Sequence, residues 1–377
     1  MIREICMVNY GFNMGGVQKV TIELANSFQD LGLDVTLIDF SGKHEFYYDL
    51  NENINVPSII NKRTIKRKII KKFLYVKYNI NNKELSVIKL YKEQIEDLIK
   101  YLKANKFKYL ILCQGLLTAF IPMIKKELPE LKVIAWQHND FKIYTEKYFN
   151  EFINEYLDGL KQSDLVVCLT AADVANYKKI NRNSCFIYNP LTIKNPRISN
   201  LLEKNILFVG RLKIKQKGLD YLIKIAQNLN AGWRIIVAGD GEDREKFKKM
   251  IKQHNMENKI ILKGSLTSKE LLEFYPSGSI FISTSRWEGF GLVITEAMAA
   301  GLPIVSFENL GPNEIIDEGR YGILVKDYDI EKFVIELKSL ILDQEKRKAL
   351  QIKSIKRAND FDINKITQEW IERLKLL

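Results

Sequence analysis

The sequence TSRWEGFGLVITEAMAAGLP, residues 284–303, joins an expected strand to an expected helix through a glycine-rich loop. The apolar run 279–283 before it is typical of a buried strand, and Gly301-Leu-Pro303 is typical of the end of a helix. A glycine-rich loop at the start of a helix points backbone N–H groups and the positive end of the helix dipole at a phosphate. These residues therefore predict an α/β domain that binds a phosphate-bearing ligand.

Two carboxylates bracket this loop, Glu288 within it and Glu296 in the expected helix. A carboxylate does not hold a phosphate, but it accepts strong charge-assisted hydrogen bonds from hydroxyl groups. A ligand that carries phosphates between two hydroxyl-rich ends is a nucleotide sugar. Two glutamates at this spacing are common in protein sequences, so the pair taken alone also fits ordinary solvated side chains.

Further motifs follow in order through residues 205–328. The strand expected at 206–209 leads into Gly210-Arg-Leu-Lys-Ile-Lys-Gln-Lys-Gly218, and the strand expected at 233–238 leads into Gly239-Asp-Gly241. Together with the Glu-x7-Glu pair, these motifs resemble the donor-binding half of the retaining glycosyltransferases of family 4, described as glycosyl transferases group 1. The resemblance implies the GT-B fold, an α/β architecture in which two Rossmann-like domains face each other across a cleft and a C-terminal helix crosses back to the first domain.

The chain length agrees with two domains, because 377 residues exceed the usual span of one hydrophobic core. We expect an N-terminal Rossmann-like acceptor-binding domain at 1–190 and a polar linker at 191–204. The C-terminal Rossmann-like domain, which would bind the nucleotide sugar, is expected at 205–358. The apolar spacing in 359–377 predicts a last helix, which the resemblance places against the first domain.

The N-terminal half opens as a doubly wound α/β domain does, with a strand at 2–8, a glycine loop, a helix and a strand at 34–40. The loop is not G-x-G-x-x-G, which counts against a dinucleotide-binding oxidoreductase. Gly15 and Gly16 in this loop would let the donor phosphates or the acceptor approach the backbone closely. A tight turn accounts for the two glycines equally well.

His138 follows the strand expected at 131–136, in the run Gln137-His138-Asn139-Asp140. A lone histidine in this position fits a structural role with a backbone partner. In the family that the chain resembles, a histidine at the corresponding strand end lies beside the donor sugar. His138 is therefore a candidate site residue, and Asp140 is a second candidate.

The family resemblance also implies roles for the residues of the C-terminal half. Arg211 and Lys217 would clamp the donor diphosphate and stabilise the charge that grows as it departs. Glu296 would accept hydrogen bonds from the ribose, and Glu288 from the transferred sugar. Because Arg211 and Lys217 could do electrostatically what a divalent metal does in other transferases, we expect neither a metal nor another cofactor. The expected donor-binding residues are Gly15, Gly16, Gly210, Gly241, Gly289, Phe290, Gly291, Leu292 and Glu296.

Residues 61–83 hold nine Lys or Arg and no acid, and their apolar side chains recur at helical spacing. Such an amphipathic helix could lie on an anionic membrane surface. A solvated helix face that packs on the sheet is the alternative, and no nucleic-acid-binding motif accompanies the charge. The formal net charge of +12 calls for an anionic partner of some kind.

The remaining composition is that of a globular protein, with 46% hydrophobic and 28% charged residues. The four scattered cysteines are expected to be buried, reduced thiols. No apolar run reaches the roughly 18 residues of a membrane span, and the first residues are too few and too acidic for a signal peptide. We therefore expect a cytoplasmic protein that associates peripherally with the inner face of the cell membrane.

The predicted function is retaining transfer of a hexose or N-acetylhexosamine from a nucleotide sugar to a glycan or lipid-linked acceptor. UDP is the expected nucleotide because it is common among similar proteins, and bacterial cell-surface polysaccharide synthesis is the expected process. A nucleotide-sugar 2-epimerase shares the architecture but needs several acid and histidine side chains, and the chain has only three histidines. A non-enzymatic glycan- or nucleic-acid-binding protein would leave the Arg, Lys and Glu set without a purpose.

Overall fold

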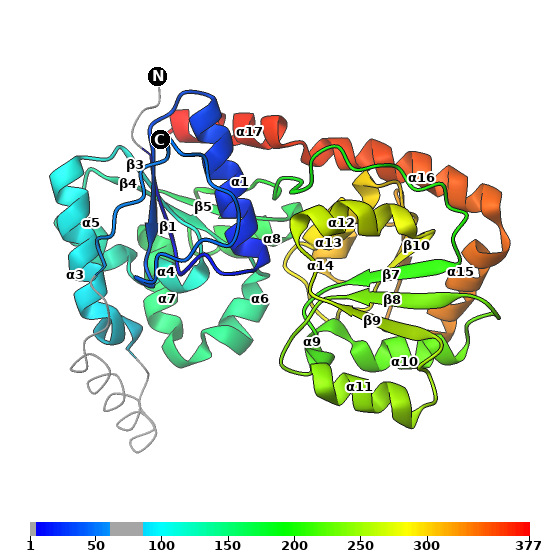
Figure 1. The fold of residues 1–377 in the computed structure, drawn as a ribbon. Coiled ribbons are helices and arrows are strands. Elements are labelled where there is room, and N and C mark those ends of the chain that lie inside the picture. The colour runs from blue at the N-terminus through cyan, green and yellow to red at the C-terminus, as the bar shows by residue number, and fades with distance from the viewer. Residues whose placement is uncertain (1–4, 61–85) are drawn as a thin grey trace, which may run out of the picture. The chain divides into compact units, whose positions relative to one another are not determined.

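The computed structural model describes residues 5–60 and 86–377. The chain forms two compact units, one made of Met1–Pro190 with Ile363–Leu377 and the other of Leu191–Asp362. Each unit is a parallel β-sheet with helices packed on its faces (Figure 1). We call them unit 1 and unit 2.

Unit 1 contains a six-stranded sheet with the strand order β2-β1-β3-β4-β5-β6. All neighbouring strands are parallel, and the central ones are buried on both faces, which explains why they read as continuous apolar runs. Its strands are β1 Ile5–Asn9, β2 Val35–Asp39, β3 Tyr109–Leu112, β4 Lys132–Trp136, β5 Leu165–Cys168 and β6 Ser184–Phe186.

The helices of unit 1 include the last helix of the chain, α17, which packs on α1. The Thr367 hydroxyl donates to Ser27 at 2.8 Å, and the Trp370 ring meets the Trp136 ring edge-on at a centroid distance of 5.0 Å. The α-helices are α1 Gly16–Asp30, α3 Val87–Asn105, α4 Gly115–Thr118, α5 Ile121–Glu127, α6 Phe141–Ile143, α7 Ile153–Gln162, α8 Ala171–Lys178 and α17 Ile363–Lys375.

Unit 2 repeats the architecture with a second parallel six-stranded sheet, in the order β12-β11-β10-β7-β8-β9. One face of this sheet packs against α10, α11 and α15 through a core of Ile, Leu, Val and Phe side chains. Its strands are β7 Asn205–Val209, β8 Arg234–Ala238, β9 Ile260–Gly264, β10 Ile280–Ser283, β11 Ile304–Phe307 and β12 Ile323–Val325.

Polar side chains begin several helices of unit 2. Thr267 and Glu270 form a reciprocal capping box at α12, and Asp329 and Asp343 cap α15 and α16. The α-helices are α9 Ile214–Lys217, α10 Leu219–Gln227, α11 Arg244–Gln253, α12 Ser268–Phe274, α13 Leu292–Ala299, α14 Leu310–Ile316, α15 Ile330–Leu342 and α16 Gln344–Ala358.

These two sheets confirm the predicted α/β class with two Rossmann-like halves, and the last helix belongs with the first half. Residues 191–204, expected as a linker, lie within unit 2, where the Ser199 N–H donates to the Ala300 carbonyl at 2.9 Å. The predicted amphipathic helix at 61–83 lies outside the described residues, so its membrane role stays a prediction.

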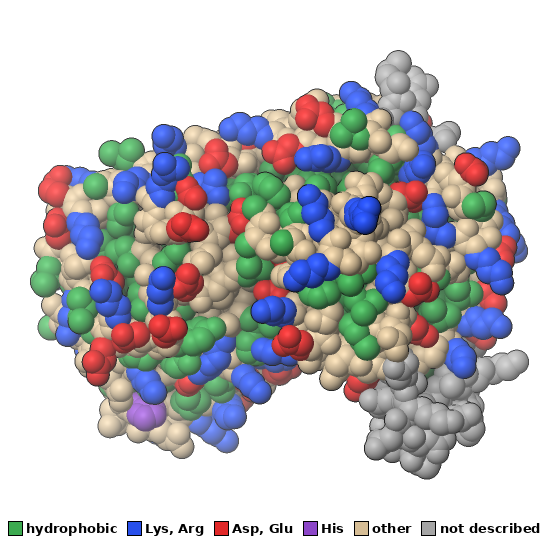
Figure 2. Space-filling view, turned by 180° about the vertical axis from the view of Figure 1, so that it is seen from behind, with side chains coloured by type: hydrophobic (Ala, Val, Ile, Leu, Met, Phe, Trp, Pro, Cys, Tyr) green, Lys and Arg blue, Asp and Glu red, His purple; other side chains and the backbone are tan. Residues whose placement is uncertain are grey.

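The four cysteines are free, and Cys6, Cys113 and Cys168 are buried as expected, whereas Cys185 is only partly buried. Within 5–60 and 86–377, no helix is both long enough and apolar enough to cross a membrane. On the face drawn in Figure 2, Lys and Arg side chains are interspersed with Asp and Glu rather than gathered in one patch. The net positive charge therefore does not mark a single anion-binding surface on that face.

Candidate functional site

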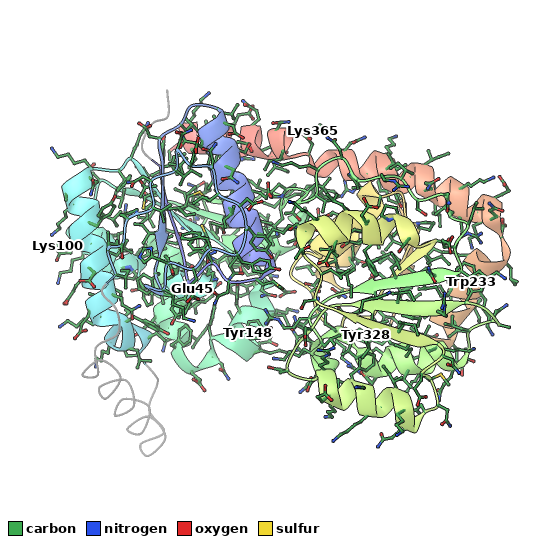
Figure 3. The ribbon with its side chains drawn as sticks, viewed as in Figure 1. Glu45, Lys100, Tyr148, Trp233, Tyr328 and Lys365 are labelled. Carbon is green, nitrogen blue, oxygen red and sulfur yellow. The ribbon has the colours of Figure 1, made fainter. Side chains whose placement is uncertain are left out.

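The carboxyl edge of the unit 2 sheet is the place where its functional loops meet. The chain runs from β7 to β8 and β9 on one side and then returns to β10 on the other side of β7. Ligands of open α/β sheets bind outside the carboxyl ends of the strands at such a switch point. In Figure 3, the labelled residue Tyr328 lies at this carboxyl edge, whereas the labelled residue Trp233 lies at the opposite edge, where β8 begins.

The loop after β7 carries both predicted cations, Arg211 and Lys217. Arg211 is exposed, and its guanidinium pairs with no other side chain in the described part of the chain. Lys217 ends the single turn α9, and Gly218 after it has a φ of +62°. A Cβ on Gly218 would lie 2.1 Å from the Thr284 carbonyl oxygen, so only glycine lets the loops after β7 and β10 approach this closely.

The loop after β10 brings Glu288 into contact with Lys217. The Lys217 ammonium forms an ion pair with the Glu288 carboxylate, and the two side chains are only 12% and 20% exposed. The Ser285 hydroxyl donates to the same carboxylate at 3.4 Å. Residues 71 positions apart thus place a cation for an anionic group directly beside an acceptor for hydroxyl groups.

Helix α13 begins at this loop, with Gly289, Phe290 and Gly291 immediately before Leu292. Gly291 has a φ of +112°, a conformation that favours glycine and turns the chain into the helix. Phe290 is buried, 3% exposed. The first N–H groups of any helix lack helical acceptors, so the backbone at Leu292 can donate to an anion at this edge.

Glu296 is buried within α13 and already has two hydrogen-bond donors. Thr192 donates to Oε1 at 2.5 Å and Tyr275 donates to Oε2 at 2.6 Å. Burial, and then the neighbouring Glu296 carboxylate, raise the pKa of Tyr275 well above its usual value, so the phenol keeps the proton that it donates. Each carboxylate oxygen has two lone pairs, so these two hydrogen bonds do not by themselves exclude a further hydroxyl donor.

The loop after β8 completes this edge through its glycines. A Cβ on Gly239 would lie 1.9 Å from the Gly210 carbonyl oxygen, and one on Gly241 would lie 2.7 Å from the Leu212 carbonyl oxygen. The Asp243 carboxylate accepts from the Ile214 N–H at 2.8 Å. Gly210 and Gly241 therefore hold loops together by close packing, which leaves a ligand contact for either of them as a prediction.

The predicted glycines of unit 1 lie at the carboxyl end of β1. Gly15 precedes α1 in an extended conformation, with a φ of 172°, and its N–H donates to the Tyr48 hydroxyl at 3.2 Å. Gly16 is the first residue of the helix.

His138 lies two residues after β4 in unit 1 and is buried, 7% exposed. Neither ring nitrogen has a hydrogen-bond partner among the described residues, and the Trp136 ring lies at a centroid distance of 4.4 Å. Burial lowers the pKa of His138 to about 3. Asp140, the other candidate here, caps α6 by accepting from the Lys142 N–H at 2.6 Å, which is a structural role.

We expect His138 to stay uncharged in the folded protein from pH 8 down to pH 5. Its folded pKa lies below the unfolded value of about 6.5, so its contribution to stability is complete above pH 6.5 and is lost as the pH falls toward 3. The measurement is the imidazole NMR resonance that disappears in His138→Gln. A titration midpoint above pH 5 for that resonance would contradict the buried environment.

Sequence reasoning missed the partners that position the predicted residues. Thr192 reaches Glu296 from a segment expected to be a linker, and no local pattern signals that contact across 104 positions. Arg286 lies two residues before Glu288 and binds Asp220 through two hydrogen bonds of 2.9 and 2.6 Å. Its place inside the glycine-rich loop was a signal that could have drawn attention to it. Among the described residues, no group of three or more His, Cys, Asp or Glu is placed to hold a metal.

Comparison with known proteins identifies relatives of this chain. The family described as "Glycosyl transferases group 1" matches residues 192–357, which lie within unit 2. An uncharacterized glycosyltransferase of Haemophilus influenzae is 30% identical to the chain, over 97% of both proteins. The amylovoran biosynthesis glycosyltransferase AmsD of Erwinia amylovora is 24% identical, over 98% of this chain and 99% of AmsD.

A solved structure shares the fold of the whole chain. The Anabaena protein HepE, crystallised in complex with UDP and glucose, superposes with a TM-score of 0.78 over 100% of both chains at 16% identity. Both units and their sheets are therefore those of the GT-B glycosyltransferase fold. The match of unit 2 to the family and the likeness to the Haemophilus protein along nearly the whole chain lead to one conclusion: the chain belongs to the glycosyltransferases and carries a glycosyl transferases group 1 domain at residues 192–357.

Proposed function

We propose that the protein transfers a hexose or N-acetylhexosamine from a nucleoside diphosphate sugar to a glycan acceptor with retention of anomeric configuration. The observation that carries this proposal is the contact between Lys217 and Glu288 at the carboxyl edge of the unit 2 sheet. In a nucleotide sugar the anomeric carbon is bonded to the terminal phosphate. A donor of this kind therefore needs a cation for the phosphate and a hydroxyl acceptor for the sugar in direct proximity.

The chemistry follows from charge at that edge. Arg211 and Lys217 hold the diphosphate, and the N–H groups at Gly289–Leu292 donate hydrogen bonds to it. Glu288 orients the transferred sugar, and Glu296 accepts hydrogen bonds from the ribose. As the bond from the anomeric carbon to phosphate breaks, the acceptor oxygen forms its bond from the same side and its proton passes to the departing phosphate. Catalysis rests on positioning and on stabilising the leaving negative charge. The two cations would do this without a divalent metal.

The names of the relatives support these donor and acceptor classes. HepE is solved with UDP and glucose, which supports a UDP-sugar as the donor. AmsD is named for the biosynthesis of amylovoran, and a relative of Campylobacter jejuni, 26% identical over 62% of this chain, is named for transfer to a diphospho-undecaprenol glycan. We infer a lipid-linked acceptor in cell-surface polysaccharide synthesis, used at the inner face of the membrane. His138 in unit 1 would serve this donor as a neutral hydrogen-bonding group.

Thermal stabilisation by nucleotides tests the proposal. At a hundred times its dissociation constant, a nucleotide that binds only the folded state adds about 2.7 kcal/mol to the free energy of unfolding. We expect UDP to raise the melting temperature clearly and ADP and GDP to raise it less, with one UDP-sugar slowly hydrolysed. No shift with any of the three would refute a nucleotide-sugar site in unit 2. Conversion of the donor to an isomer, without acceptor, would instead identify an epimerase.

A further inference from the structure

The Arg286 side chain joins the two loops that carry the predicted diphosphate and sugar ligands. Its guanidinium donates to both carboxylate oxygens of Asp220, at 2.9 and 2.6 Å. It also donates to the carbonyl oxygens of Lys215 at 3.2 Å and Ile214 at 3.4 Å, both in the turn α9. One side chain of the β10 loop thus binds the backbone of the turn that ends in Lys217.

Backbone contacts reinforce the same junction. The Arg286 N–H donates to the Gln216 carbonyl at 2.8 Å, and the Thr284 hydroxyl donates to the Lys217 carbonyl at 2.8 Å. The carbonyl oxygens of Ile214, Lys215, Gln216 and Lys217 therefore all accept a hydrogen bond from the loop after β10.

Two tyrosines hold Arg286 in place, Tyr221 at the guanidinium and Tyr328 at the backbone. The guanidinium centre lies 4.0 Å from the centroid of the Tyr221 ring, and Nε donates to the Tyr221 hydroxyl at 3.2 Å. The Tyr328 hydroxyl, at the edge labelled in Figure 3, donates to the Arg286 carbonyl at 2.7 Å. The planar guanidinium has five N–H donors, so it can donate hydrogen bonds to a carboxylate, two carbonyls and a phenol at the same time. A lysine ammonium in that position cannot do this.

We propose that Arg286 is a positioning residue that holds the turn bearing Lys217 against the loop bearing Glu288, so that both charges are in place before the donor binds. The proposal rests on the function proposed above and goes beyond it, because Arg286 itself would not touch the donor. A single helical turn has little stability of its own. Without Arg286, the turn would have to be ordered when the diphosphate binds, and that ordering would weaken binding.

The test is a double-mutant cycle on UDP affinity, measured by titration calorimetry with the full chain. We expect Arg286→Gln to raise the dissociation constant of UDP at least tenfold, and Asp220→Asn to raise it by a similar factor. Arg286→Lys keeps the charge but loses the fork, so it should not restore affinity. In a Lys217→Ala background, Arg286→Gln should change the dissociation constant less than twofold, because its effect passes through Lys217.

The matched control is Arg320→Gln, which removes an exposed arginine of unit 2 that pairs with Asp317 at 3.2 Å. It should leave UDP affinity within twofold of the wild type. If Arg286→Gln does not fold, the UDP dissociation constants of Asp220→Asn and Arg286→Lys are compared instead, in the wild-type and Lys217→Ala backgrounds. Wild-type affinity in Arg286→Gln, or an undiminished tenfold effect in the Lys217→Ala background, would overturn the positioning role. Failure of the wild type to bind UDP, ADP or GDP would instead refute the proposed function.

Discussion

Replacing Lys217 with alanine is expected to lower the turnover of sugar transfer at least a hundredfold, and Arg211→Ala is expected to do the same. The Lys217 side chain is only 12% exposed and contacts Glu288, so its charge acts where water screens it little. Loss of one fixed donor to a developing anion typically lowers turnover by about a hundredfold to a thousandfold. The measurement is the initial rate at saturating concentrations of the donor identified by the nucleotide experiment.

Lys215→Ala is the matched control for Lys217→Ala. Lys215 lies in the same turn, but its side chain is exposed and only its backbone carbonyl binds Arg286. Its replacement should leave turnover within twofold of the wild type. A loss below threefold in both Arg211→Ala and Lys217→Ala would rule out a two-cation clamp on the diphosphate.

The second large effect is expected on stability, from Gly218→Ala. The residue has a φ of +62°, and an added Cβ would lie 2.1 Å from the Thr284 carbonyl oxygen. The backbone strain costs about 1–2 kcal/mol, and relieving the overlap costs a further 1–3 kcal/mol, roughly. For a unit of this size, a loss of about 3 kcal/mol lowers the melting temperature by about 6–12 °C. Differential scanning calorimetry measures the shift of the unit 2 transition.

Gly264→Ala is the control that shows the effect of backbone strain without the steric overlap of the added Cβ. Gly264 has a similar φ of +79°, but nothing lies within 4 Å of the position that its Cβ would take. Its replacement should lower the melting temperature by about 2–8 °C, as expected for about 1–2 kcal/mol of backbone strain alone. Equal shifts for the two variants would mean that the loops after β7 and β10 are not held at this close approach.

Local sequence patterns were sufficient to predict the sheets. Apolar runs such as 280–283 and 206–209 are buried on both faces of a parallel sheet, so their composition alone marks them. The helices between β4 and β6 were harder to predict. Gly159 lies inside α7 and is normally a weak helix former, yet a Cβ there would lie 1.9 Å from the Thr118 carbonyl oxygen. The residue is needed for a tertiary contact that the sequence does not reveal.

The candidate site likewise has residues that local motifs predict and contacts that only the fold creates. Lys217, Glu288 and Glu296 could be predicted because each lies in a short motif next to a recognisable strand end. The hydrogen bonds to Glu296 from Thr192 and Tyr275, and the hold of Arg286 on α9, depend on which loops the fold brings together. No spacing along the chain encodes those contacts. Neither ring nitrogen of His138 has a hydrogen-bond partner within 5–60 and 86–377, and this too is a property of its tertiary surroundings.

The place of α17 has a consequence for how the protein is made. Residues 191–362 must be synthesised between Pro190 and the helix that packs on α1. At about 5–20 residues per second, the ribosome takes roughly 10–35 s to make that interval. During that time the nascent unit 1 exposes the surfaces of Ser27 and Trp136 that α17 later covers. Those surfaces are where a chaperone would be expected to bind the unfinished polypeptide.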